Sequence, residues 1–344
     1  MAVISVDAMG GDRGISATVP AALASLKKHI NLELILVGDE KLLRRALRKC
    51  KADNHPRLKI QHASEVVAMD ESPALALRGK KDSSMRVAIN LVKEGQANAC
   101  VSAGNTGALM ATARFVLKTL PGIDRPAIIY ALPAYDRGND QMTSVHMLDL
   151  GANIECSAQH LFEFAIMGAS LTEAVDGLSK PRIALLNIGQ EDIKGLEPIK
   201  QAAKLLTDEP TINYIGFIEG NDIFSAKADV VVCDGFVGNV ALKTTEGVAA
   251  LLGAMLKQSL FNTFMGRVTA LLAVPVLWRI KKRFDIRRYN GASFLGIKGI
   301  VVKSHGGADR IAFATAIEEA IKETEKDIPA LIHARVEARL GESS

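Results

Sequence analysis

This chain lacks the cysteine patterns that are typical of a protein stabilised by a bound metal ion. Its 344 residues include four cysteines that lie far apart, with no C-x-x-C pair and no histidine nearby at zinc-ligand spacing. That scatter excludes a zinc ribbon and favours buried thiols in a reducing cytosol. The cysteines are Cys50, Cys100, Cys156 and Cys233.

The sequence also lacks a leader and a membrane-spanning segment. The amino terminus has neither a basic region nor a long apolar one, and residues 3–7 instead predict a first strand. No uninterrupted apolar run reaches the length of about 20 residues that a spanning helix requires. These absences favour a cytoplasmic protein.

Three familiar catalytic motifs are missing as well. The glycines at 10, 11 and 14 lack the G-x-G-x-x-G spacing of a nicotinamide dinucleotide site, although Asp39 stands roughly where a ribose-binding acid could lie. No lysine follows Gly107, so the loop before it is not a Walker A loop. There is no G-x-S-x-G elbow and no cysteine in an activating setting. We therefore favour an enzyme that positions two substrates and stabilises the charge that develops as one attacks the other.

What the sequence does have is a regular alternation of strand-like and helix-like segments, with 48% hydrophobic residues to build a large core. Expected strands cover 3–7, 32–37, 58–62, 99–102, 127–131, 144–149, 182–188, 214–219, 230–233 and 299–302. Expected helices cover 15–29, 41–49, 85–94, 108–117, 157–167, 196–206 and 306–324. The pattern predicts an α/β fold in which a largely parallel sheet lies between two layers of helices. We expect one catalytic body, residues 1–250 and 290–344, with ligands at the carboxyl ends of the strands.

Several of these strands end in a short polar, glycine-containing loop that leads into a helix. The first amides of a helix have no partner within it, and the helix dipole adds partial positive charge there, so each junction is a potential phosphate site. The candidate phosphate or substrate ligands are Asp7, Gly10, Gly11, Ser102, Gly104, Asn105, Thr106, Gly107, Asp149, Asn153, Asn187, Gly235, Gly238, Lys303 and Gly306.

Each junction also has a purely structural alternative. Asn105 or Thr106 can cap the helix that follows, and Asn239 can either cap its helix or donate its amide to an acyl oxygen. Lys194, in a polar loop after a strand, can neutralise an oxyanion or remain a solvated surface charge. His305 can act as acid, base or phosphate donor, or be structural.

The alternation of strand-like and helix-like segments stops between residues 251 and 289. We expect these residues to form a helical excursion, a segment that leaves the main body of the fold. Residues 279–288 contain six Lys or Arg residues and one Asp, although the net charge of the chain is only +4. This local patch favours an acidic partner or a membrane surface over nucleic acid. The apolar face of the excursion fits helix packing, dimerisation or contact with a membrane surface. The candidate contacts are Leu271, Val274, Trp278, Arg279, Lys281, Lys282 and Arg283.

The motifs at 6–12, 102–108, 149–153, 187–189, 234–240 and 303–306 together resemble those of the bacterial phosphate acyltransferase (PlsX) family, in order and over essentially the whole chain. The resemblance implies acyl transfer from acyl carrier protein to inorganic phosphate, with no metal or other cofactor. It also implies a fold like that of isocitrate and isopropylmalate dehydrogenases, usually a homodimer. The acyl phosphate would feed a membrane glycerol-3-phosphate acyltransferase and thus phospholipid synthesis. The enzyme would be cytoplasmic and peripherally bound to the inner face of the cell membrane.

On this resemblance, Lys194 and Asn239 hold the phosphate or the developing oxyanion, and His305 belongs to a matching motif without a fixed role. Three rivals remain. A decarboxylating dehydrogenase of the same fold would need a nucleotide and clustered carboxylates, and no such cluster is visible. A phosphotransacetylase-like enzyme would use acyl coenzyme A in the same chemistry, and a scaffold could bind acyl carrier protein at a membrane without turning it over.

Overall fold

The computed structural model describes residues 1–262, 265, 269, 271, 273–274 and 286–342. Eleven strands form one sheet in the order β3-β2-β1-β4-β11-β10-β5-β6-β9-β7-β8. Their bounds are β1 Ala2–Asp7, β2 Leu32–Gly38, β3 Leu58–His62, β4 Ala99–Ser102, β5 Ala127–Asp136, β6 Gln141–Leu148, β7 Arg182–Leu186, β8 Asn213–Ile218, β9 Val230–Val232, β10 Ala292–Leu295 and β11 Ile300–Lys303.

The pairings among these strands are parallel, except that β10 is antiparallel to both β11 and β5, and β5 is antiparallel to β6. The predicted, largely parallel sheet is confirmed. The missed element is β10, four residues that join the two parallel halves into one sheet.

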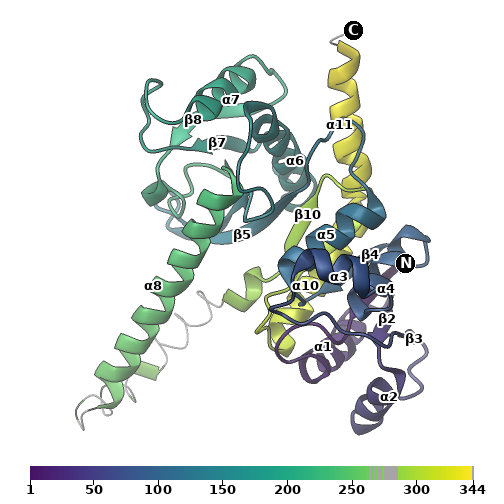
Figure 1. Cartoon of the computed structure of the whole chain (residues 1–344). Helices are drawn as coiled ribbons and strands as arrows, with labels where there is room; N and C mark the ends of the chain where they lie inside the picture. The colour runs from purple at the N-terminus through teal and green to yellow at the C-terminus, as the bar shows by residue number, and fades with distance from the viewer. Residues whose placement is uncertain (263–264, 266–268, 270, 272, 275–285, 343–344) are drawn as a thin grey trace.

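Helices cover both faces of the sheet (Figure 1). On one face, α1 (Ile15–Lys28) and α10 (Arg310–Lys326) pack over the first half, while α6 (Ala158–Asp176), α7 (Glu197–Thr207) and α11 (Ile328–Glu342) pack over the second. On the other face lie α4 (Ser84–Lys93) and α5 (Thr106–Leu117). Two further helices, α2 (Glu40–Lys49) and α3 (Pro73–Gly79), lie at the periphery of the first half.

Strand residues alternate between the two cores, as a buried sheet requires. In β5, Ala127 and Ile129 face the α6 side, while Ile128 and Leu132 face the α5 side. The sheet therefore carries apolar side chains on both faces, which explains why its strands are nearly continuous hydrophobic runs in the sequence.

The observed helices refine the predicted ones. The expected helix 306–324 begins at Arg310, because Asp309 is its N-cap and accepts hydrogen bonds from the amides of Ile311 and Ala312. The expected helix 157–167 continues to Asp176, and α3 and α11 had no sequence prediction.

The longest helix, α8 (Gly235–Phe261), starts at the carboxyl edge of the sheet and projects away from the body (Figure 1). The predicted boundary at residue 250 falls inside this continuous helix, and the division of the chain into two parts stays a prediction. Within the described ranges, no helix combines the length and apolarity needed to cross a bilayer.

Candidate active site

Three of the polar loops meet at one edge of the sheet because β1, β4 and β11 are adjacent and parallel. The register places Asp7 beside Ser102 and Ser102 beside Lys303, each at the end of its strand. The loops are also bonded to one another: the Ser304 amide donates to the Ser102 carbonyl at 2.8 Å, and the Asp12 amide donates to the Gly306 carbonyl at 2.9 Å.

Asp7 is the buried centre of this cluster. Its carboxylate accepts hydrogen bonds from the hydroxyls of Ser84 and Ser102, each at 2.6 Å, and from the Gly10 amide at 3.2 Å. Burial raises the pKa of Asp7, while these hydrogen bonds act in the opposite direction. The Ser102 hydroxyl also accepts from the Gly104 amide at 3.0 Å. Both side chains are therefore engaged within the protein and help to shape the site, and their predicted contact with substrate stays a prediction.

The glycines of the first loop serve close packing. A Cβ on Gly10 would lie 2.5 Å from a carboxylate oxygen of Asp7, and one on Gly11 would lie 2.8 Å from the Gly306 carbonyl oxygen. Gly11 also has a φ of +84°, which favours glycine. Asn105 is the N-cap of α5, with its side-chain oxygen accepting from the Ala108 amide. The capping alternative therefore holds for Asn105. The phosphate-binding role of Gly10 and Gly11 stays a prediction.

Asp149 builds the matching loop in the second half of the sheet. Its buried carboxylate accepts from the amides of Ile128, Ala152 and Asn153 and from the Asn153 side chain, at 2.6–3.2 Å. Burial raises the pKa of this carboxyl as well. Gly238 lets α8 approach the loop, because a Cβ there would lie 1.9 Å from the Asp149 carbonyl oxygen.

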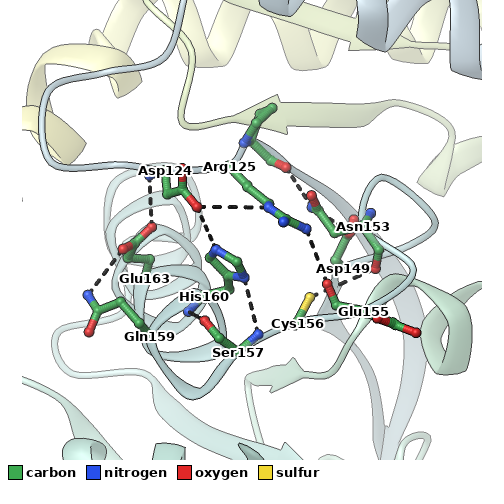
Figure 2. Close-up of polar contacts among 11 residues, drawn as sticks. Asp124, Arg125, Asp149, Asn153, Glu155, Cys156, Ser157, Gln159, His160 and Glu163 are labelled. Carbon is green, nitrogen blue, oxygen red and sulfur yellow. Dashed lines mark hydrogen bonds and ion pairs between the residues drawn. The ribbon is translucent and has the colours of Figure 1, made fainter.

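Figure 2 shows how this loop is bonded to residues 124–126, which are bonded in turn to α6. The Asn153 side chain donates to the Pro126 carbonyl at 2.8 Å, and His160 Nε2 lies 2.7 Å from the Asp124 carboxylate. Although Ser157, His160 and Asp124 are the residue types of a hydrolase triad, His160 Nδ1 accepts from the backbone amide of Ser157, and the Ser157 hydroxyl accepts from the His160 amide. This is a helix capping box.

The two halves face each other across a cavity of about 290 Å³. The first half contributes Thr106, Gly107, Lys303 and His305, and the second contributes Asn239 at the start of α8. The structure thus brings together five of the predicted residues from three separate loops. Apolar side chains complete the wall: Ile128, Tyr130, Leu150, Leu242 and Ala292.

Lys303 is the buried cation of the cavity. Burial lowers the pKa of its ammonium to about 8, and the carboxylates of Asp7 and Asp12 offset part of that effect. Its Nζ lies 3.4 Å from the Ala103 carbonyl oxygen and also contacts the Ser304 carbonyl oxygen. This partly desolvated cation lines the same cavity as the start of α5, and a helix start and a buried cation both favour binding of an anion.

His305 is held in one orientation at the mouth of the cavity. Its Nδ1 accepts from the Gly307 amide at 3.0 Å, and its own amide donates to the Asn290 side chain at 3.0 Å. In the neutral ring the proton is therefore assigned to Nε2, which is left as a donor.

Lys194 and Asn187 do not line this cavity. The Lys194 ammonium forms an exposed ion pair with Glu191 at 2.8 Å, and the Asn187 side chain donates to the Lys194 carbonyl at 3.1 Å. Both lie after β7, beyond β9 from the cavity. The predicted action of Lys194 with Asn239 is not seen in this conformation. The catalytic role of Lys194 and the substrate-binding role of Asn187 stay predictions.

The structure also shows contributors that the sequence analysis missed. Asn290 is buried and bridges the Ser304 hydroxyl, the Ala312 carbonyl and the His305 amide. Ser84 bonds to Asp7 from 77 residues away in the chain. Neither had a sequence signal, because a single polar residue at a helix start or before a strand is common. In the excursion, Leu271 and Val274 are exposed, and the other candidate contacts lie outside the described residues: Trp278, Arg279, Lys281, Lys282 and Arg283.

Comparisons with known proteins agree with this geometry. A family model described as "Fatty acid synthesis protein" matches residues 2–331. Proteins named phosphate acyltransferase from Halorhodospira halophila and Alcanivorax borkumensis are 54% and 56% identical to this chain, over 98% and 96% of it and 97% and 96% of their own lengths. A phosphotransacetylase from Streptococcus pyogenes has a similar fold, with a TM-score of 0.61, 19% identity and 94% of each chain covered.

Proposed function

This chain belongs to the bacterial phosphate acyltransferase family, and on that basis we propose that it moves an acyl group from acyl carrier protein to inorganic phosphate. The chain is an acyltransferase that uses phosphate, as its relatives are named. The observation that supports the finer proposal is the cavity, which combines a buried lysine, the start of a helix and an asparagine on the facing wall.

We infer that phosphate occupies the Lys303 side of the cavity. The ammonium of Lys303, the first amides of α5 at Thr106 and Gly107, and Nε2–H of His305 are the donors available to its oxygens. The donors come from rigid strand and helix ends, so they are oriented before phosphate arrives.

Asn239 is placed to act on the other substrate. It extends from the first turn of α8 on the opposite wall, where its side-chain amide can donate to the thioester carbonyl oxygen as negative charge develops. An oxygen of hydrogen phosphate then forms a bond to the carbonyl carbon, and the carbon–sulfur bond breaks. The electron pair leaves with sulfur, which takes the proton of hydrogen phosphate, so the products are acyl phosphate and free thiol.

Lys194, the other lysine of the proposed site, needs a movement of its loop to reach the cavity. We propose that Lys194 joins Asn239 at the reacting carbonyl when residues 187–195 shift toward the cavity. Its present ion pair with Glu191 opposes this movement little, because the pair is exposed and solvent-screened.

The exposed face of α8 supports a peripheral role. Leu251, Leu252, Met255, Leu256 and Phe261 are each more than half exposed on the projecting part of this helix. We propose that the segment meets the cytoplasmic face of the membrane or a second copy of the chain, near the glycerol-3-phosphate acyltransferase that consumes the product. Leu271→Glu with Val274→Glu is expected to abolish binding to anionic liposomes. Unchanged binding would leave the segment a dimer contact.

One assay separates the proposal from its rivals. Purified protein is incubated with acyl-acyl carrier protein, with or without phosphate, and released thiol and acyl phosphate are measured. Thiol release that depends on phosphate supports the proposed reaction. Turnover of acyl coenzyme A alone would favour the phosphotransacetylase alternative, and binding of the carrier without turnover would favour a scaffold.

A further inference from the structure

A basic surface lies on α2, and its residues are distant in the sequence from the basic stretch 279–288. Residues 41–51 contain six Lys or Arg residues and no Asp or Glu. Leu43 and Leu47 are fully buried and fix the helix to the body, so the charged side chains face solvent. Arg44 pairs with Glu40 at 2.8 Å, and among the described residues Arg45 and Lys49 have no acidic partner.

An apolar groove runs between this helix and α1. Ile15, Val19 and Pro20 of α1 form one wall and Leu42 and Ala46 of α2 the other, around a volume of about 530 Å³. Arg45 and Lys49 stand on its rim. The residues of α2 that line the groove recur at i, i+3, i+4 and i+7, so they form one face of the helix.

The groove opens beside the active-site loops. Helix α1 begins directly after the loop that contains Gly11 and Asp12, and α2 begins directly after β2, so both helices start at the carboxyl edge of the sheet (Figure 1). Met9 of the same loop packs against Gly38 at the end of β2, where a Cβ would lie 2.6 Å from its side chain. The end of the groove formed by Ile15 and Leu42 therefore lies toward the side of the molecule from which the cavity loops extend, and Lys49 lies at the other end.

Charge and shape together define the occupant. The two rim cations, Arg45 and Lys49, favour an acidic partner, and the apolar strip beside them favours an apolar residue on that partner. An acidic amphipathic helix offers both, whereas a nucleic-acid backbone offers no apolar strip. We propose that α2 and its groove with α1 are the docking surface for the acidic acyl carrier protein. This rests on the proposed function, since it assigns a place to the carrier of that reaction.

The test compares two charge-reversed proteins. Arg45→Glu with Lys49→Glu alters the rim, and Lys204→Glu is the control, an exposed lysine on α7 in the other half of the sheet. Binding of apo acyl carrier protein is measured by calorimetry at two salt concentrations. We expect the rim variant to raise Kd at least tenfold at low salt and to lose most of the salt dependence, and the control to bind like the original protein.

Steady-state kinetics supply the second readout. In the rim variant the KM for acyl-acyl carrier protein is expected to rise at least tenfold, with a much smaller change in kcat and in the KM for phosphate. Leu42→Ser, which alters the groove without a change of charge, is expected to raise the same KM severalfold. Leu42 is 47% exposed, so this change leaves the core intact.

The outcomes are distinguishable. If the unaltered protein turns over the carrier substrate and the rim variant does so with the same KM, the docking surface lies elsewhere and the inference is wrong, while the proposed function stands. If the unaltered protein neither binds nor uses the carrier, both are wrong. Loss of binding to RNA or to anionic vesicles, with carrier binding unchanged, would assign α2 to a different partner and overturn the inference.

Discussion

Asp7 and Asp149 occupy comparable places in the two halves of the sheet, yet their surroundings differ. Both are buried carboxyls at the end of a strand, and burial raises the pKa of both. Asp149 accepts from amides alone, three in its own loop and one at Ile128 in β5. Asp7 accepts from two hydroxyls and the Gly10 amide, and it has the ammonium of Lys303 nearby. The aspartate of the second half therefore fixes the backbone of its loop. The aspartate of the first half instead raises the pKa of Lys303.

In the proposed reaction, this contrast divides the work between the halves. The wall that contains Asp7 supplies the buried cation Lys303 for phosphate, and the wall that contains Asp149 supplies the side-chain amide of Asn239 for the carbonyl. Lys243 of this second wall is paired with Glu246 at 2.8 Å. Because a phosphate dianion needs a cation more than a carbonyl does, the asymmetry matches the two substrates of the proposed reaction.

The largest expected effect is the loss of activity when Lys303 or Asn239, one from each wall of the cavity, is replaced. It tests whether the two walls act on the same transition state. Lys303→Met and Asn239→Ala should each lower kcat/KM for phosphate by about 100- to 1000-fold, the loss typical when one transition-state donor is removed. The double variant should be only slightly worse than either single one, because the two groups act on the same transition state. Steady-state kinetics measure all three.

Lys298→Met is the matched control, since Lys298 is an exposed lysine just before β11. A Lys303 variant with the activity of this control would remove the cation from the mechanism, and strictly multiplicative effects would show that the walls act independently.

The next effect concerns stability and should distinguish the two aspartates. Asp149→Ala leaves four hydrogen-bond donors without their acceptor and should lower the free energy of unfolding by about 3 kcal/mol. Asp7→Asn keeps an oxygen that can accept from Ser84 or Ser102, so its cost should be near 1 kcal/mol. Urea unfolding followed by circular dichroism measures both. Equal losses would mean that the two carboxyls have the same structural role.

The smallest effect is a shift with pH. The pKa of Lys303 is lowered to about 8, so its positive charge is present below that pH and is lost as the pH rises through it. The KM for phosphate dianion should therefore increase above pH 8, by up to tenfold per pH unit. Asp7→Asn should move the rise to lower pH, because the Asp7 charge raises the pKa of Lys303.

The same shift has a consequence for stability with the opposite trend. Between about pH 8 and the ordinary pKa of lysine, the unfolded chain binds more protons than the folded one, so the contribution of Lys303 to stability improves as the pH rises.

A phosphate KM that is flat from pH 7 to 9 would contradict the assignment of Lys303 as the phosphate cation.

Much of the fold could be predicted because the buried strands are short apolar runs bounded by glycine and polar residues. The bounds of β3 and β4 agree with the expected strands 58–62 and 99–102. In contrast, β10 was missed because Ala-Ser-Phe-Leu is too short to show a period, and its antiparallel place depends on partners distant in the sequence.

The candidate site could be predicted as a set of loops but not as an arrangement. The adjacency of β4 and β11 is what brings Ser102 beside Lys303, and strand order is not written in either segment alone. For the same reason, sequence could not tell that Asn105 would cap its own helix or that Lys194 would pair with Glu191 outside the cavity.

The antiparallel strand β10 also limits how the enzyme can open. It is hydrogen-bonded to β11 on one side and to β5 on the other, so a single ladder of backbone bonds runs beneath the cavity from one half to the other. Two lobes joined by a loose linker could swing apart freely. Here the two halves belong to one continuous sheet, so widening the cavity between them requires the sheet itself to twist.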